Sequence, residues 1–123
     1  PGLASILQNT RQPFNPNLLA QEAAVAALAD DEQQKKTKDI TDEGRELLQN
    51  EFEKMGIEFV RSYANFVLIK VGDGDAVFEK MLKKGVIVRA MRGYKLPEWI
   101  RVSIGTKDEN MKFLELLRSI IIK

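Results

Sequence analysis

The amino-acid sequence predicts an α+β fold: a small, mostly antiparallel sheet of about four strands with helices on one face, preceded by two helices. Three observations lead to this prediction. Helical patterns fill the first part of the chain, the apolar spacing changes to short strand-like runs after Gly56, and the remaining elements come in the order β-β-α-β-β-α. Helices gathered on one face of such a sheet let every element bury an apolar side.

The N-terminal part of the chain is predicted to hold two helical stretches joined by an ordered connection. Apolar residues recur at helical spacing in residues 3–10, which favours a short helix. Residues 11–17, Arg-Gln-Pro-Phe-Asn-Pro-Asn, are typical of a non-helical connection, because each proline fixes its own φ and favours extended geometry before it. Asn15 or Asn17 is expected to cap a helix at 18–29, which is rich in alanine.

A long amphipathic helix and two strands are predicted for the middle of the chain. The helix follows the acidic residues 30–32, and Gly56 stands where a glycine commonly ends a helix. Its apolar stripe consists of Ile40, Leu47, Leu48, Phe52 and Met55. The segments 57–60 and 65–71 are short and rich in β-branched and aromatic residues, which predicts a pair of antiparallel strands.

The C-terminal part is predicted to add two helices and two more strands. Its first segments are a turn at 72–75, a helix at 76–84, a strand at 86–88, a loop at 92–97 and a strand at 99–104. An Asp of the turn can cap the first helix, and Gly85 is placed to end it. Thr106 and Glu109 have the spacing of a capping box, which predicts where the last helix begins. The stripe of that helix consists of Met111, Leu114, Leu117 and Ile121.

The residue types that the chain lacks narrow the chemistry open to it. The sequence has no Cys and no His, which excludes disulfides, zinc sites built from thiolate or imidazole, and nucleophile–histidine triads. The net charge of +1, with acids interleaved among the bases, gives no reason to expect nucleic acid as a partner. No apolar run reaches the roughly 18 residues of a membrane span, so we expect no membrane partner. We also expect no metal site.

Two arginines are candidate ligands for an anion. Arg101 lies inside the strand at 99–104, where alternation places it on the face opposite the apolar side chains. Arg89 directly follows the strand at 86–88. A guanidinium group can bind a carboxylate or a phosphate through two parallel hydrogen bonds. The alternative is that both side chains are solvated surface charges, and the pattern alone leaves both interpretations open.

Other noticeable residues have simpler explanations. The turn at 72–75, Gly-Asp-Gly-Asp, lacks the Gly-Lys-Ser/Thr of a phosphate-binding loop and the oxygen ligands of a calcium loop, so we interpret it as a turn and helix cap. Tyr63 and Tyr94 are expected in loops, where they can donate to a ligand or pack at a surface. Trp99, close to Pro97, is interpreted as a core residue.

Five segments, in order along the chain, resemble the C-terminal part of histidinol-phosphate aminotransferases. They are residues 11–24 (Arg-Gln-Pro-Phe-Asn-Pro-Asn and the alanine-rich run after it), 63–67 (Tyr-Ala-Asn-Phe-Val), 85–89 (Gly-Val-Ile-Val-Arg), 93–98 (Gly-Tyr ahead of Leu-Pro-Glu) and 100–106 (Ile-Arg-Val-Ser-Ile-Gly-Thr). The resemblance covers essentially the whole chain. The first and third segments favour this family over aromatic or aspartate aminotransferases.

This resemblance implies a fold-type I enzyme that binds pyridoxal phosphate and works as a cytoplasmic homodimer. Members transfer an amino group between glutamate and imidazole-acetol phosphate in histidine biosynthesis, and the cofactor serves as an electron sink. The family's Schiff-base lysine belongs to a large domain ahead of this segment, in a Ser-x-x-Lys context that no lysine here matches. We therefore expect residues 1–16 to be a connection from a missing large domain and 17–123 to be the small domain. The start at Pro1 fits such a cut, and we expect no catalytic or cofactor-binding residue and no activity in the isolated chain.

The resemblance also implies roles for the two candidate arginines. Arg101 matches the strand arginine that holds the anionic group of the substrate, and Arg89 matches the arginine that helps to bind the phosphate of histidinol phosphate. Three alternatives stay open. The chain is also compatible with a related pyridoxal-phosphate enzyme, either a threonine-phosphate decarboxylase or an aromatic aminotransferase, and with an excised, non-catalytic folding or scaffold domain.

Overall fold

The computed structural model describes residues 2–11 and 14–121, which divide into two compact units, residues 1–36 and 37–123. The first unit contains helices α1 (Gly2–Thr10) and α2 (Leu18–Leu28), and none of their residues is buried. Of the two candidate caps, Asn17 is the one used: its side chain accepts a hydrogen bond of 2.8 Å from the amide of Ala20. Pro13, part of the predicted connection, lies outside the described residues.

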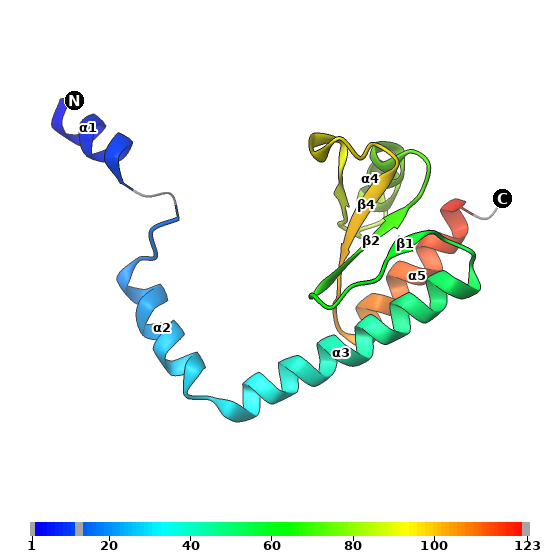
Figure 1. The fold of residues 1–123 in the computed structure, drawn as a ribbon, viewed down its shortest axis with the longest axis horizontal. Helices are drawn as coiled ribbons and strands as arrows, with labels where there is room; N and C mark the ends of the chain where they lie inside the picture. The colour runs from blue at the N-terminus through cyan, green and yellow to red at the C-terminus, as the bar shows by residue number, and fades with distance from the viewer. Residues whose placement is uncertain (1, 12–13, 122–123) are drawn as a thin grey trace. The chain divides into compact units, whose positions relative to one another are not determined.

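The second unit contains most of the long helix and the whole sheet (Figure 1). In chain order the elements are α3 (Asp31–Lys54), β1 (Phe59–Val60), β2 (Phe66–Lys70), α4 (Gly74–Lys83), β3 (Arg89–Ala90), the 3-10 helix η1 (Arg92–Tyr94), β4 (Trp99–Ser103) and α5 (Lys107–Ile121). The four strands lie in the order β1-β2-β4-β3, and all neighbours are antiparallel. This arrangement confirms the predicted α+β class.

Local signals placed most element boundaries correctly. Gly56, after α3, has a φ of 66°, in the left-handed region that glycine adopts at little cost. Asp73 caps α4 by accepting a hydrogen bond of 3.0 Å from the amide of Ala76. The predicted capping box also forms, because the Glu109 carboxylate accepts a hydrogen bond of 2.8 Å from the amide of Thr106.

The third strand is shorter and lies later in the chain than predicted. The prediction placed it at 86–88, but only Arg89 and Ala90 pair with β4. Val86 instead donates its amide to the carbonyl of Met81 at 3.0 Å, which ties it to the end of α4. Val88 is buried in the core. Within this apolar run only Val88 is buried, and Ile87 is 80% exposed, before the chain reaches strand geometry at Arg89.

The core lies on one face of the sheet. Helices α3, α4 and α5 and strands β2 and β4 contribute most of the fully buried residues, which include Leu48, Phe52, Val67, Ile69, Met81, Ile100, Leu114 and Leu117. The alternation along β4 is as predicted, with Ile100 and Val102 buried between more exposed neighbours. The stripe predicted for the last helix is wrong at Met111, which is 38% exposed.

A glycine in α3 allows the close approach of the turn that follows β4. A Cβ atom added at Gly44 would lie 2.7 Å from both Asn110 Nδ2 and Ile104 Cγ2. Asn110 is 3% exposed, accepts a hydrogen bond from the Gly105 amide and donates one to the Gly105 carbonyl, both at 3.0 Å. This paired contact holds Gly105 against α5 and leaves Asn110 little room to move.

We expect Gly44→Ala to lower the free energy of unfolding. Overpacking a tight contact costs about 1–3 kcal/mol, which outweighs the gain of roughly 1 kcal/mol that alanine brings to a helix. Gly93→Ala is the matched control, because a Cβ atom there would meet nothing within 4 Å. Urea denaturation of both variants checks the prediction. If Gly44→Ala is at least as stable as the wild type, the contact of Gly44 with Ile104 and Asn110 has room for a methyl group.

Candidate functional site

The open face of the sheet carries polar and charged side chains opposite the core. On β4 the residues that alternate with the buried Ile100 and Val102 are Trp99, Arg101 and Ser103. The interpretation of Trp99 as a core residue is wrong, since its place in the alternation puts it on the open face, where it is half-buried. This face is therefore where a ligand can reach Arg101.

The two candidate arginines lie directly opposite each other on neighbouring strands. Arg89 of β3 pairs in register with Arg101 of β4, so both side chains project from the same face of the sheet. Like charges directly opposite each other destabilise a sheet. Among the described residues, neither arginine forms an ion pair with a carboxylate. The fold thus places two uncompensated cations side by side, which is the charge arrangement that a bound anion would stabilise.

Each of these arginines lies over an aromatic ring. The guanidinium carbon of Arg101 is 5.1 Å from the ring centroid of Phe66 on β2. That of Arg89 is 5.5 Å from the ring centroid of Tyr94 in η1. Arg101 Nε is buried and has no hydrogen-bond partner among the described residues. Since a buried donor is expensive to leave unpaired, this N–H group remains available to an acceptor outside the described residues.

The other residues considered from the sequence lie away from these arginines or have structural roles. The turn at 72–75 serves as the cap of α4, as predicted. Tyr63 is 86% exposed in the loop between β1 and β2. A surface pocket between residues 85–88 and the start of α5 contains neither arginine. The arginine pair is therefore separate from this pocket.

None of the described lysine side chains is buried. Every described lysine except Lys70 is exposed, and Lys70 Nζ lies 3.5 Å from a carboxylate oxygen of Glu58 and 3.8 Å from one of Glu98. Within the described ranges, no cluster of acidic side chains is suited to a metal ion.

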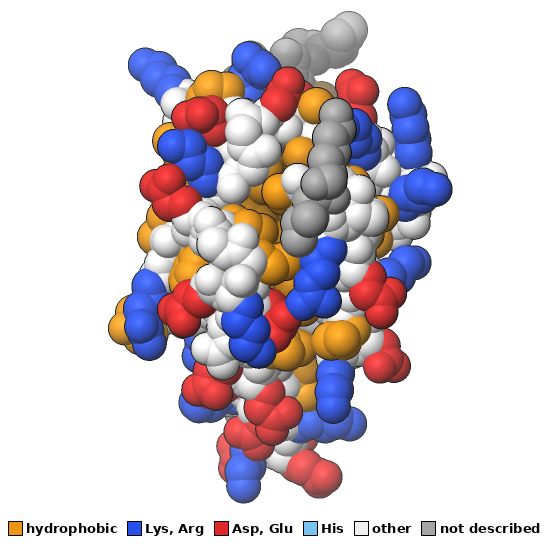
Figure 2. Space-filling view, turned by 90° about the vertical axis from the view of Figure 1, so that its right-hand side faces the viewer, with side chains coloured by type: hydrophobic (Ala, Val, Ile, Leu, Met, Phe, Trp, Pro, Cys, Tyr) orange, Lys and Arg blue, Asp and Glu red, His pale blue; other side chains and the backbone are white. Residues whose placement is uncertain are grey.

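The surface carries charges of both signs, as expected from a sequence with nearly equal numbers of basic and acidic residues. On the face shown in Figure 2, basic and acidic side chains are interspersed among apolar ones. Among the described residues, no helix is long and apolar enough to cross a membrane.

Comparison with known proteins shows which family this chain belongs to. The sequence profile described as aminotransferase class I and II matches residues 2–117, which include β2, β3 and β4 and both arginines. The chain belongs to this family. The match covers the sheet and the helices that flank it.

Two curated relatives of this aminotransferase chain carry the same name. It is 49% identical over 119 residues to a histidinol-phosphate aminotransferase of Akkermansia muciniphila, a match that covers 97% of this chain and 33% of the relative. It is 42% identical over 121 residues to a histidinol-phosphate aminotransferase of Methylobacillus flagellatus, with 98% and 33% covered. The chain thus spans about a third of the length of the curated relatives it matches.

Solved aminotransferase structures share the fold. The histidinol-phosphate aminotransferase of Clostridium acetobutylicum matches with a TM-score of 0.76 at 26% identity, covering 95% of this chain and 37% of that one. A putative aminotransferase of Burkholderia pseudomallei matches with a TM-score of 0.79 at 24% identity, covering 94% and 36%. The likeness extends over nearly the whole aminotransferase chain.

Sequence reasoning missed the aromatic rings beside the two arginines. Phe66 was assigned to a strand and Tyr94 to a loop, where it can donate to a ligand or pack at a surface. Both lie in segments that resemble the family, but neither was linked to an arginine. The alternation of β2 and β4 indicates which residues share a face, but the register that sets Leu68 opposite Arg101, and so Phe66 diagonal to it, exists only in the folded sheet.

Proposed function

We propose that this chain is the substrate-anion-binding domain of a pyridoxal-phosphate-dependent aminotransferase that acts on histidinol phosphate and glutamate in histidine biosynthesis. In this proposal the domain works with a large domain of the same enzyme, which supplies the lysine and the cofactor site. The complete protein is a homodimer in the cytoplasm. Arg101 binds the anionic group of the substrate, and Arg89 contributes to binding the phosphate.

The observation that carries this proposal is the pairing of Arg89 with Arg101 in a chain of this family. Two unneutralised guanidinium groups at directly opposed positions form a small region of positive charge. Glutamate and histidinol phosphate differ in their anionic groups, yet both must be accepted in turn by the same enzyme. A pair of arginines suits this task because guanidinium binds both carboxylate and phosphate bidentately. The unpartnered Nε of Arg101 adds one further donor.

Steady-state assays of the full-length protein that contains this chain test the proposed reaction. We expect transfer of the amino group from histidinol phosphate to 2-oxoglutarate, and no decarboxylation of threonine phosphate. The reverse result would assign the chain to a threonine-phosphate decarboxylase. Preference for aromatic amino acids over histidinol phosphate would assign it to an aromatic aminotransferase. If the full-length protein has none of these activities, the result would favour the alternative of a non-catalytic folding or scaffold domain.

Arg89→Lys in the full-length protein tests how the two arginines divide the substrates. Lysine keeps the charge but loses the planar fork, so a bidentate contact becomes a single one. We expect kcat/KM for histidinol phosphate to fall more than kcat/KM for glutamate, by about threefold to tenfold relative to it. Arg118→Lys is a control, because Arg118 is already paired with Glu51 away from the open face. Equal losses for both substrates would contradict the assignment of Arg89 to the phosphate.

A further inference from the structure

Arg89 and Arg101 differ from the three arginines of the domain that form ion pairs with carboxylates. Arg45, Arg92 and Arg118 form ion pairs with Asp42, Asp75 and Glu51. Arg89 and Arg101 have no such partner among the described residues, although they face each other across the sheet. Instead, the guanidinium group of Arg89 lies over the ring of Tyr94, and that of Arg101 lies over the ring of Phe66. The difference needs a physical reason, because two facing cations are costly to leave uncompensated.

We propose that Phe66 and Tyr94 are positioning residues, whose rings hold the guanidinium groups of Arg101 and Arg89 in place for a carboxylate or phosphate ligand. This inference rests on the proposed anion-binding role of the two arginines. The face of an aromatic ring carries negative potential, so it attracts a guanidinium group and partly offsets the repulsion between the two cations. A carboxylate in the same place would occupy the N–H groups that a bidentate ligand needs. A ring attracts the cation without forming those hydrogen bonds.

The geometry of the sheet brings Phe66 to Arg101. In the register between β2 and β4, Phe66 pairs with Ser103 and Leu68 pairs with Arg101. Phe66 and Arg101 are therefore diagonal neighbours on the open face, at a separation that a long side chain spans. The guanidinium carbon lies 5.1 Å from the ring centroid, within the range of a cation–π contact.

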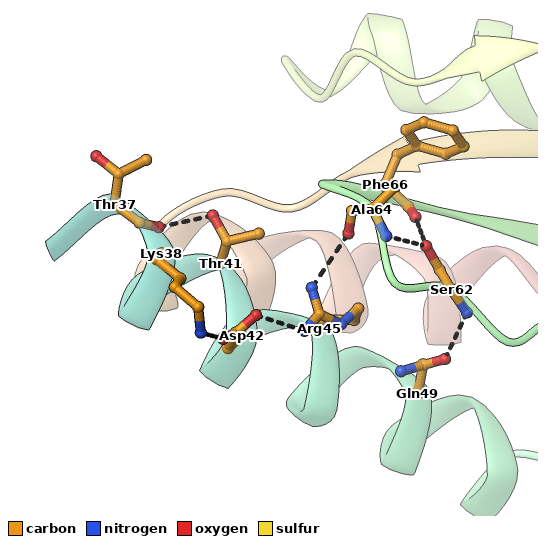
Figure 3. A network of polar contacts seen from close by, with 9 residues as sticks. All are labelled: Thr37, Lys38, Thr41, Asp42, Arg45, Gln49, Ser62, Ala64 and Phe66. Carbon is orange, nitrogen blue, oxygen red and sulfur yellow. Dashed lines mark hydrogen bonds and ion pairs between the residues drawn. The ribbon is translucent and has the colours of Figure 1, made fainter. Parts of the chain in front are cut away.

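Polar contacts to α3 hold the backbone on which Phe66 is placed (Figure 3). Ser62 Oγ donates a hydrogen bond to the carbonyl of Phe66 and accepts one of 3.1 Å from the amide of Ala64. The amide of Ser62 in turn donates to Gln49 Oε1 at 3.0 Å. Arg45 Nη1 donates to the carbonyl of Ala64 at 3.3 Å. The loop that leads into β2 is thus fixed to the long helix, and the start of the strand with it.

Tyr94 is held in a comparable way from the other side. It ends η1, and its amide donates to the carbonyl of Met91 at 2.9 Å. Arg92, in the same short helix, forms an ion pair with Asp75 of α4. The hydrogen bond with Asp75 is the main cause that raises the pKa of Arg92 above its usual value. Both rings therefore sit on segments that are tied to a helix.

The test uses the full-length protein and removes each ring in turn. Phe66→Leu and Tyr94→Leu keep apolar bulk but lose the π face, whereas Phe66→Tyr and Tyr94→Phe keep the ring. Phe59→Leu is the matched control: Phe59 is also a half-buried strand aromatic, but its ring faces that of Phe52 at a centroid distance of 5.9 Å. Isothermal titration calorimetry of the cofactor-free protein with 2-oxoglutarate and with inorganic phosphate measures anion binding without turnover. Steady-state kinetics then separate KM from kcat.

We expect both leucine variants to raise the dissociation constants of the anions by about threefold to tenfold, the range of a partly exposed cation–π contact. KM should rise in step while kcat stays within about twofold. The ring-keeping variants should restore binding, and Phe59→Leu should bind as the wild type does. Wild-type anion binding by both leucine variants would overturn the inference, as would a failure of the ring-keeping variants to restore it.

Arg101→Lys, measured in parallel, separates this inference from the proposed function. If Arg101→Lys weakens anion binding and the leucine variants do not, the rings have no positioning role and the anion site still stands. If Arg101→Lys has no effect either, the anion site and the inference fall together. If the wild-type protein binds the anions through Arg101 and the rings but does not transaminate histidinol phosphate, only the proposed reaction fails.

Discussion

Arg101→Lys in the full-length protein should lower kcat/KM for both half-reactions by about tenfold to a hundredfold. The physical reason is that lysine keeps the positive charge but loses the guanidinium fork, and one hydrogen bond to a charged group contributes about 1.5–3 kcal/mol. Arg101 is half-buried in the middle of β4, with an Nε that lacks a partner in the described structure. In the proposed site, a ligand oxygen or a water bound to the ligand accepts a hydrogen bond from this atom. Steady-state kinetics with glutamate and with histidinol phosphate measure the loss.

A loss through misfolding would be seen in other properties, so the variant needs a structural check. Circular dichroism and urea denaturation of Arg101→Lys should resemble those of the wild type, and the absorbance spectrum of the bound cofactor should not change. Arg118→Lys is a useful control, because Arg118 is paired with Glu51 away from the open face. Unchanged kcat/KM in Arg101→Lys would reduce this residue to a surface charge and remove the central site of the account.

The second prediction is that this chain alone forms no covalent adduct with pyridoxal phosphate. When the purified 123-residue chain is mixed with pyridoxal phosphate and reduced with borohydride, we expect no stoichiometric labelling of a single lysine. The nucleophile must be an uncharged amine, and the reference pKa of a lysine side chain, about 10.4, leaves little of it at neutral pH. Lys38 is shifted further from this form, because its hydrogen bond to Asp42 raises its pKa.

Mass spectrometry of the reduced chain gives the result directly. Low, scattered labelling of several exposed lysines is the expected background. One fully labelled lysine would contradict the proposal that the large domain supplies the Schiff-base lysine. In that case the labelled residue would have to lie in an environment that lowers its pKa.

The parts of the fold that depend on short-range chemistry were predictable from the sequence. Thr106 and Glu109 mark the start of α5 by contacts within one helical turn. Gly56 marks the end of α3 because few other residues adopt its φ of 66°. Arg101 was placed on the open face by alternation alone, and this placement is confirmed. Its role in binding stays a prediction.

The parts that depend on long-range packing were not predictable in this way. Residues 86–88 are apolar and β-branched, which suits a strand and equally suits a buried segment that leaves α4. Only the packing of Val88 against the core decides between the two. The stripe of α5 likewise depends on which side faces α3, where Gly44 makes room for the polar Asn110 at a position that a hydrophobic pattern would skip. Phe66 and Tyr94 became candidates only when the strand register and the η1 turn were known.

A crystal structure of the full-length protein with histidinol phosphate bound would test the central claim most directly. The account predicts that phosphate oxygens lie within about 3 Å of guanidinium nitrogens of Arg101 and Arg89, and that Arg101 Nε donates to the ligand or to a water bound to it. The Phe66 and Tyr94 rings should remain against the two guanidinium groups. A ligand bound elsewhere, with both arginines facing solvent, would contradict the account.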